Sequence, residues 1–358
     1  MKFRKVRLPQ DGSAHKNIIE WWYFNGHLQD ASGRRYSFMD CLFQADLKRV
    51  ELPLLKAPFR KSLDLPYIYF SHSVVSDLVR KKSYKDIQNI SLLSGDSFRR
   101  PLLYANYFNP LSLSDGYVNC EMVETEPFRF HIKNSRIDLS LVSRKPPLLE
   151  GGRGFIDVCG RKSYYYSLTD LAAVGTINVA GRTVKVSGRA WMDHQWADVA
   201  YSRDAWSWFS LQLSDGTDIM CVEYRVGEQR DYSVDIIDAQ GRTSHYDRLI
   251  LKTGRQSWKS AKTKAEYPLE WEIDIPDQRI SLKTKATMRD QEMIFGAINY
   301  WEGPLSVSGS VGHKKVSGVG FMELVGYKSD YNFIALAGQA LNHKIGRAIF
   351  AKVKKIML

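Results

Sequence analysis

The hexapeptide WMDHQW, which begins at Trp191, carries a carboxylate, an imidazole and two indoles. These side chains could perform acid–base chemistry, because Asp193 and His194 can give and take protons and aromatic faces stabilise cations. In an extended strand, His194 and Trp196 point to one side. The opposite side then carries Trp191, Asp193 and Gln195. The segment therefore predicts two environments instead of one compact cluster, unless a bulge or turn intervenes.

Metal and cofactor chemistry finds little support in the sequence. The histidines are dispersed, with no H-x-H or H-E-x-x-H spacing, so any metal site would have to be assembled wholly by the fold. There is also no G-x-S-x-G elbow, no P-loop and no glycine-rich dinucleotide motif. We therefore expect no metal and no cofactor.

Charge and cysteine usage narrow the class of protein. The chain has 358 residues and a formal net charge of +12, which favours encounters with anionic partners. Its basic residues are scattered, however, and no nucleic-acid-binding motif is present, so nucleic acid is not expected as a partner. The four isolated cysteines predict reduced, packed thiols. With no secretory signal and no run of ~18 apolar residues, we expect a cytoplasmic protein of unknown oligomeric state.

Most of the chain has the composition of antiparallel β-structure. Short segments rich in Val, Ile, Tyr, Phe and Trp alternate with glycine-containing turns. The pairs Asp215-Gly216 and Ala180-Gly181 suit tight hairpins, because glycine accepts a positive φ. In the segment 145–154, KPPLLEGGRG, prolines and glycines interrupt any ladder, so we expect a surface loop there.

A short pattern occurs twice, about half the chain apart. The segments 21–30 and 206–215 both read Trp-x-aromatic-Phe-x-x-x-Leu-x-Asp. A duplicated β-domain explains this spacing, and coincidence is the alternative. If both copies are strands, alternation gives each copy one shared face, with Trp21, Tyr23, Asn25 and His27 in the first and Trp206, Trp208, Ser210 and Gln212 in the second. Large aromatics mixed with small polar groups favour a ligand cavity, with packing as the alternative for any one aromatic.

The chain resembles the carotenoid hydratase and AttH-like family, which includes hydroxyneurosporene synthase. The resemblance rests on six segments in order from residue 20 to about residue 327: EWWYFNGHLQD, KPPLLEGGRG with the following SYYYS, GRAWMDHQW, WSWFSLQLSDG, YWEGPLSVSG and GVGFMELVGY. It implies an all-β fold of two tandem lipocalin-like antiparallel β-barrel domains. We place these domains at residues 1–199 and 200–358, in agreement with the repeat.

The resemblance also implies a class of ligand. We expect a lipophilic small molecule of isoprenoid, polyene or polyketide-like type in an aromatic-lined cavity. The chain would act on it as a hydratase-like lyase or as an isomerase or cyclase. A non-catalytic carrier of the same kind of ligand is the alternative. The residues expected to bind the substrate are Trp21, Tyr23, Asn25, Tyr165, Trp191, Trp196, Trp206 and Trp208.

Hydration of an alkene sets requirements for the catalytic residues. It needs an acid kept protonated by burial, a base for water and aromatic faces for the carbocation. The hydratase branch carries a His-x-Trp element, which His194 and Trp196 match. Its downstream Tyr-x-Asp element is not reproduced here, and Glu223 is the candidate substitute for that acid. We therefore expect His194, Asp193 and Glu223 to be catalytic, with a structural hydrogen-bonding role as the alternative for His194.

Three further carboxylates are interpreted as structural. Glu20 precedes an aromatic run, where we expect it to pair with an arginine or histidine. Glu302 and Glu323 are expected to anchor neighbouring strands by hydrogen bonds or ion pairs. None of the three is expected to be a catalytic acid.

The C-terminal segment 341–358 has the pattern of a basic amphipathic helix. Apolar residues recur at helical spacing from Leu341 to Ile356, with lysines and an arginine mostly opposite. Such a helix can bind the surface of an anionic membrane. Packing across its own barrel is the alternative.

Overall fold

The computed structural model describes residues 4–46, 49, 66–109, 119–199, 204–295 and 298–329. Within these ranges the chain is nearly all strand, which confirms the all-β fold class. Its short 3₁₀ helices are η1 (Gln10–Gly12), η4 (Glu150–Gly152) and η5 (Pro276–Gln278). No helix among the described residues is long and apolar enough to cross a membrane. The amphipathic segment 341–358 lies outside the described residues.

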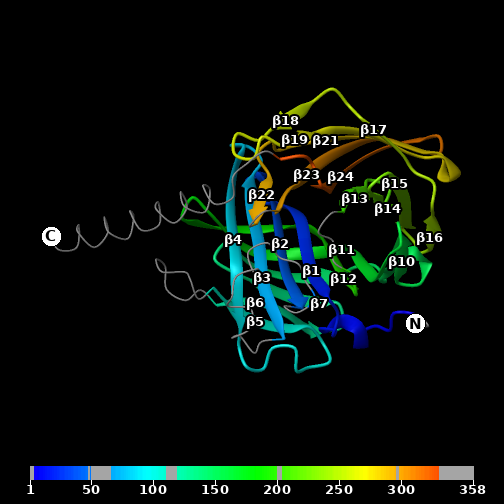
Figure 1. Ribbon diagram of the computed structural model, residues 1–358. Coiled ribbons are helices and arrows are strands. Elements are labelled where there is room, and N and C mark those ends of the chain that lie inside the picture. The colour runs from blue at the N-terminus through cyan, green and yellow to red at the C-terminus, as the bar shows by residue number, and fades with distance from the viewer. Residues whose placement is uncertain are drawn as a thin grey trace.

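The first half of the chain forms a closed barrel, sheet A (Figure 1). Its strands are β1 (Ile19–Gln29), β2 (Arg35–Asp46), β3 (Tyr67–Asp77), β4 (Lys82–Leu93), β5 (Tyr104–Phe108), β6 (Cys120–Glu126), β7 (Arg129–Lys133), β8 (Ile137–Ser143), β9 (Leu148–Leu149), β10 (Phe155–Val158), β11 (Arg161–Val179) and β12 (Arg182–Ala197). All except β9 and β10 close into an antiparallel ring, in the order β11-β12-β1-β2-β3-β4-β5-β6-β7-β8, because β8 pairs with β11. This ring is the barrel that the lipocalin-like prediction requires.

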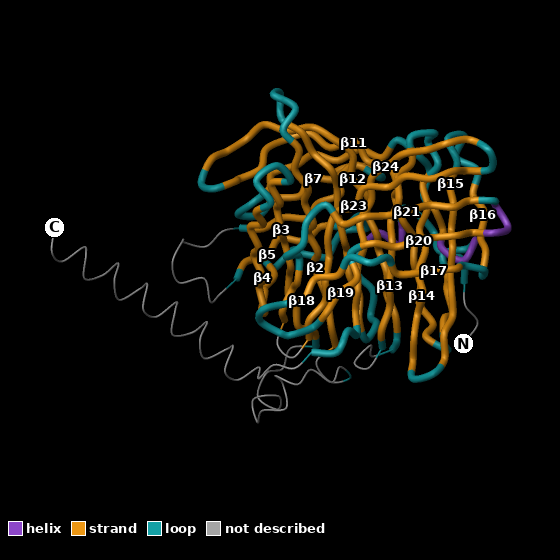
Figure 2. The backbone as a smooth tube through the Cα atoms, turned by 90° about the horizontal axis from the view of Figure 1, so that it is seen from above, coloured by secondary structure: helices purple, strands orange, loops and turns teal. Residues whose placement is uncertain are grey.

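The second half forms sheet B, which lies beside the barrel (Figures 1 and 2). Its strands are β13 (Ala205–Leu213), β14 (Asp218–Val226), β15 (Gln229–Ile237), β16 (Thr243–Tyr246), β17 (Ile250–Thr253), β20 (Glu270–Ile275), β21 (Ile280–Ala286), β22 (Glu292–Phe295), β23 (Ile298–Val311) and β24 (Lys314–Val325). They run antiparallel in the order β16-β15-β14-β13-β24-β23-β21-β20-β17, with β22 on β23; β18 (Ser257–Lys259) and β19 (Glu266–Pro268) pair separately. The strands divide between the sheets close to residue 200, and the division into two independent domains stays a prediction.

Because side chains alternate along a strand, β1 contributes both to the core inside the barrel and to the core between the barrel and sheet B. Trp22 and Phe24 point into the barrel, where they join a hydrophobic cluster drawn from most of its strands. Their neighbour Tyr23 points outward and packs with Trp208 and Phe321 of sheet B. β1 is therefore buried on both faces, whereas β20 and β21 alternate between buried and more exposed positions. The barrel interior is a packed core, and the outer face of β1 belongs to the contact between the sheets.

The predicted turns are confirmed at both hairpins. Gly216 adopts a φ of 85° between β13 and β14, and Ala180 and Gly181 both adopt positive φ between β11 and β12. The surface-loop prediction for 145–154 holds for Pro146, Gly152 and Arg153, which are exposed, and is wrong for residues 148–150. Leu148 and Glu150 are fully buried, because β9 pairs with β11 and the segment packs against β15 and β16 of sheet B.

The repeated sequence pattern corresponds to equivalent strands in the two sheets. β1 lies between β12 and β2, and β13 lies between β24 and β14. Tyr23 is opposite Asp193 on β12, and its counterpart Trp208 is opposite Glu323 on β24. Asp193 and Glu323 are therefore equivalent positions. The two equivalent faces also meet, because Asn25 Nδ2 lies 3.5 Å from Ser210 Oγ.

Candidate functional site

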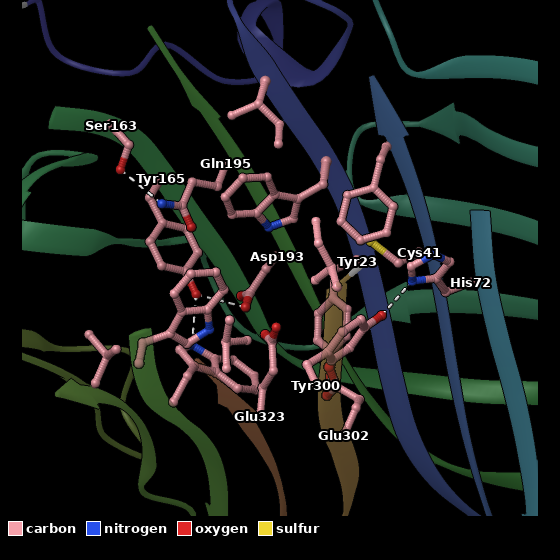
Figure 3. A pocket seen from close by; sticks show the side chains of 18 of the residues that line it. Tyr23, Cys41, His72, Ser163, Tyr165, Asp193, Gln195, Tyr300, Glu302 and Glu323 are labelled. Atoms are coloured by element: carbon pink, nitrogen blue, oxygen red, sulfur yellow. Dashed lines mark hydrogen bonds between the residues drawn. The ribbon is translucent and has the colours of Figure 1, made fainter. Parts of the chain in front are cut away.

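A cavity of about 220 Å³ lies between the outer face of the barrel and sheet B (Figure 3). Its walls are mainly aromatic and aliphatic, and they include a small number of polar side chains. This combination is typical of sites for hydrophobic small molecules. The polar groups on the wall are His72, Arg161, Ser163, Asp193, Gln195, Glu302 and Glu323, together with the tyrosine hydroxyls.

Most of the aromatic residues predicted to bind substrate line this cavity. The five that do so are Trp21, Tyr23, Tyr165, Trp206 and Trp208. They come from β1, β11 and β13, so both equivalent strands contribute to the cavity wall. Tyr23 and Trp208, which are repeat counterparts, meet edge to face with ring centroids 5.7 Å apart.

The other three predicted binding residues lie outside the cavity wall. Trp191 is buried beside it and donates its indole N–H to Asp193. Asn25 donates to the Tyr23 hydroxyl at 3.1 Å and helps to join the two sheets. Trp196 lies on the opposite face of β12, inside the barrel, where it stacks on His15.

Asp193 is the acid of the opening hexapeptide that faces the cavity. Its Oδ1 accepts hydrogen bonds from Ser167 Oγ at 2.5 Å and Trp191 Nε1 at 2.6 Å. Its Oδ2 accepts one from the Tyr165 hydroxyl at 2.7 Å. Burial nevertheless outweighs these donors and raises the pKa of Asp193 from 3.8 to about 6. The carboxyl can therefore exchange a proton close to neutral pH.

Glu302 and Glu323 are paired across β23 and β24 and face the same cavity. Burial raises the pKa of Glu323 to about 7, against a hydrogen bond from Trp206. Burial, followed by the charge of Glu323, raises the pKa of Glu302 well above its usual range, and the Tyr23 hydroxyl donates to Glu302 at 2.5 Å. The expectation that these two glutamates anchor neighbouring strands is confirmed for hydrogen bonds, since Tyr23 donates to Glu302 and Trp206 donates to Glu323. The ion-pair alternative is wrong, because neither glutamate has a basic partner among its described contacts.

His72 is a further polar group on the cavity wall that the sequence did not indicate. Its Nδ1 lies 2.5 Å from the Tyr300 hydroxyl, and its Nε2 is buried with no hydrogen-bond partner among the described residues. Burial lowers the pKa of His72 to about 3, so the ring is neutral.

His194 lies on the other face of β12, as alternation predicted, and does not reach the cavity. Its Nε2 contacts Glu20 Oε1 at 2.7 Å, and His15 Nδ1 contacts the same oxygen at 2.7 Å. The expectation that Glu20 pairs with a histidine is confirmed. Ligand atoms of these three residues lie within 4.8 Å of one another, a spacing that could hold a metal ion. The fold thus assembles a group that no sequence motif indicated.

Glu223 also lies away from the cavity. It is buried on β14, pairs with Arg225 and lies 3.3 Å from Arg230. Its neighbours Val222 and Tyr224 face the cavity instead, because successive strand residues point to opposite sides. In the structure Glu223 therefore occupies a charge-paired structural position.

The sequence contained a signal for the overlooked acid Glu323. The segments GRAWMD, from Gly188, and GVGFME, from Gly318, both read Gly-x-x-aromatic-Met-acid. The strand registers place them at equivalent positions, with Gly188 opposite Leu28 and Gly318 opposite Leu213. The repeat therefore extends to these segments. Aligning the two sequences is enough to show that Asp193 and Glu323 occupy equivalent positions.

Comparison with known proteins agrees with this architecture. A solved AttH protein of Nitrosomonas europaea has a TM-score of 0.70 at 24% identity, covering 91% of this chain and 98% of that one. The kievitone hydratase structure from Nectria haematococca has a TM-score of 0.66 at 16% identity, covering 90% and 93%. At such identities the likeness shows the fold alone.

Curated relatives match over a shorter length. Kievitone hydratase of Fusarium solani subsp. phaseoli is 21% identical over 202 residues, which is 54% of this chain and 57% of the relative. The dehydratase asqC of Emericella nidulans is 21% identical over 52% of this chain and 54% of its own length. The chain therefore spans about half the length of these curated relatives. Hydration of a carotenoid stays a prediction. Because residues 1–327 match the family described as AttH-like, the chain belongs to the AttH-like family.

Proposed function

We propose that this protein is a hydratase-like lyase that adds water to a hydrophobic alkene, or removes it from the alcohol, in the cavity between the sheets. One observation carries the proposal. Asp193 and Glu302 are buried and Glu323 is half-buried on an aromatic wall, and the pKa of each is raised. A largely apolar cavity with carboxyls that titrate near neutral pH suits proton transfer to and from carbon and water.

The two equivalent acids divide the chemistry between them. The protonated Glu323 carboxyl gives its proton to an alkene carbon, and the adjacent carbon becomes a cation. Ionised Asp193 takes a proton from the water molecule whose oxygen bonds to that cation. Dehydration is the reverse of these steps. Glu302, which stays protonated, keeps a second negative charge away from Glu323.

The aromatic wall supplies the stabilisation that a carbocation requires. Trp208 and Trp21 line the cavity on β13 and β1, and aromatic faces attract cations by their quadrupole. The neutral ring of His72 adds no competing positive charge. The Tyr300 hydroxyl, which lies 2.5 Å from His72 Nδ1, also belongs to a residue of the cavity wall.

The substrate we propose is an isoprenoid, polyene or polyketide-like molecule. Two relatives are named as a hydratase and a dehydratase, which supports a reaction that adds or removes water. The mostly apolar lining of the cavity supports a lipophilic ligand. The cavity of about 220 Å³ lies below the ~300–1,000 Å³ usual for drug-sized ligands. It therefore favours a short molecule, or one end of a longer chain.

The test is incorporation of isotope from labelled water. The purified protein is incubated with prenylated phenols, linear polyenes and polyketide-like β-hydroxy ketones, and products are followed by mass spectrometry. A hydratase incorporates labelled oxygen into an alcohol or forms the alkene by dehydration. Binding of these molecules without turnover would identify a carrier, and an unlabelled rearranged product would identify an isomerase or cyclase. Either result contradicts the proposal.

Isosteric variants assign the activity to the cavity. Glu323→Gln and Asp193→Asn are expected to lower the rate by roughly 10²-fold or more, because each removes one proton-transfer group. Glu223→Gln is the matched control, since Glu223 is a buried carboxylate outside the cavity. Equal losses in all three variants would contradict the assignment.

A further inference from the structure

A chain of buried oxygens leads from the cavity acid Asp193 toward the outside of the molecule. Ser167 Oγ lies 2.5 Å from Asp193 Oδ1 and 2.6 Å from Glu150 Oε1. All three residues are buried, and Glu150 and Ser167 are completely so. Glu150 belongs to the KPPLLEGGRG segment, to which the proposed chemistry assigns no role.

Proton counting shows which carboxyl in this chain is protonated. The Ser167 hydroxyl has one proton and can donate it to only one of the two carboxyl oxygens. Asp193 already accepts from Trp191 and Tyr165, so it is the ionised acceptor. The Glu150 carboxyl must then be protonated and donate to Ser167 Oγ. Burial and the nearby charge of Asp235 act in the same direction by raising the pKa of Glu150 well above its usual range.

The chain continues into sheet B. The Glu150 carboxyl is hydrogen-bonded to that of Asp235 on β15. Asp235 also accepts a hydrogen bond from the backbone N–H of Gly151, next to Glu150, at 3.0 Å. Its Oδ1 lies 3.0 Å from His245 Nδ1. The His245 side chain is 29% exposed, and its Nε2 contacts the exposed Asp247 at 3.0 Å. Hydrogen bonding to Asp235 raises the pKa of His245. His245 is therefore a titratable group at the outer end of the chain.

We propose that Glu150 and Ser167 form a proton relay that resets Asp193 between turnovers by exchanging protons with Asp235 and His245. This role rests on the proposed function, in which Asp193 takes a proton from water. The relay removes that proton without opening the cavity to bulk water. Glu150 and Ser167 touch no substrate in this mechanism and act through Asp193.

The proton transfer from Asp193 to His245 conserves the number of protons at each step. Once Asp193 is protonated and can donate to Ser167 Oγ, the Glu150 proton turns from Ser167 to Asp235 and passes to it, and neutral His245 takes a proton from Asp235. The Ser167 hydroxyl then turns toward ionised Glu150 and gives it a proton, while Ser167 Oγ accepts the proton of Asp193. Each O–H bond that breaks is matched by an O–H or N–H bond that forms. The net result is one proton moved from Asp193 to His245, and the reverse sequence reloads Asp193 for dehydration.

The test needs no substrate, so it can fail independently of the proposed function. After a rapid pH change between about 5 and about 8, which spans the pKa of Asp193, infrared spectroscopy follows the carbonyl band of protonated Asp193. The band is assigned by its loss in Asp193→Asn. Ser167→Ala and Glu150→Gln are expected to slow the change roughly tenfold or more, because the exchanging proton loses its path.

Two controls separate a relay from a structural effect. Ser73→Ala makes the same substitution at a buried serine outside the cavity wall, where Ser73 Oγ accepts from Asn134, and should keep the wild-type rate. At neutral pH the wild-type spectrum should also contain a protonated-carboxyl band that Glu150→Gln removes. If Ser167→Ala and Glu150→Gln keep the wild-type rate, or if Glu150 contributes no such band, the relay is wrong.

Discussion

At the scale of single residues, the three cavity carboxyls Asp193, Glu302 and Glu323 have no basic partner among the described residues. Asp193 is stabilised by three donors, whereas Glu323 is paired across strands with another acid, Glu302. Burying such groups costs stability, because the charged form loses its hydration. Proteins tolerate this cost where function requires it. The raised pKa values are thus consistent with a site selected for chemistry instead of for stability.

The stability cost of Glu323 should depend on pH. Its folded pKa of about 7 lies above its ordinary value of 4.5, so the folded protein binds this proton more tightly than the unfolded chain. Its contribution to stability is therefore complete below about pH 4.5 and is lost as the pH rises toward about 7. Glu323→Gln should raise the melting temperature more at about pH 8 than at about pH 4. An equal shift at both pH values would contradict the raised pKa.

At the scale of strands, alternation predicted the two sides of the hexapeptide correctly. His194 and Trp196 face one way, and Asp193 faces the other. The sequence could not tell which side faced a cavity, because both faces of β12 are buried among aromatic residues. It also could not place Glu150, whose position depends on the packing of two distant sheets. Local pattern decides which way a side chain points, and tertiary packing decides what that side chain meets.

Glycines hold the central strands close together in both copies of the repeat. A Cβ added to Gly188 on β12 would lie 2.0 Å from the His27 carbonyl oxygen, and one added to Gly318 on β24 would lie 2.5 Å from that of Gln212. Gly188→Ala should therefore lower the free energy of unfolding by about 2 kcal/mol in urea denaturation, since the backbone must shift. Gly95→Ala is the control, because a Cβ there meets no atom within 4 Å. Equal stability of the two variants would show that β1 and β12 can separate at no cost.

At the scale of the whole molecule, the cavity exists only where the barrel and sheet B meet. A buried ion pair joins the two on one side: Lys145 Nζ lies 2.6 Å from Asp218 Oδ2. Arg189 on β12 also reaches Asp218, at 3.3 Å. The fold class and the repeat could be predicted from sequence, but this cross-sheet contact could not, because its partners share no local pattern.

Breaking that contact should destabilise the whole molecule. Asp218→Asn leaves Lys145, which is 9% exposed, without its charge partner, and loss of one member of a buried pair costs about 3 kcal/mol. Urea denaturation measures this loss. Glu272→Gln breaks an exposed pair with Lys283 and is expected to change stability little. A loss no larger in Asp218→Asn than in Glu272→Gln would show that the ion pair does not hold the sheets together.

The most direct test of the proposed chemistry is the pH dependence of hydration of a hydrophobic alkene that the protein turns over. The rate should rise as Asp193 ionises, with a pKa of about 6, and fall as Glu323 loses its proton, with a pKa of about 7. Asp193→Asn should lower the rate by roughly 10²-fold and remove the acid-side limb of the profile. An Asp193→Asn variant that keeps both the wild-type rate and that limb would contradict the assignment of the chemistry to this cavity.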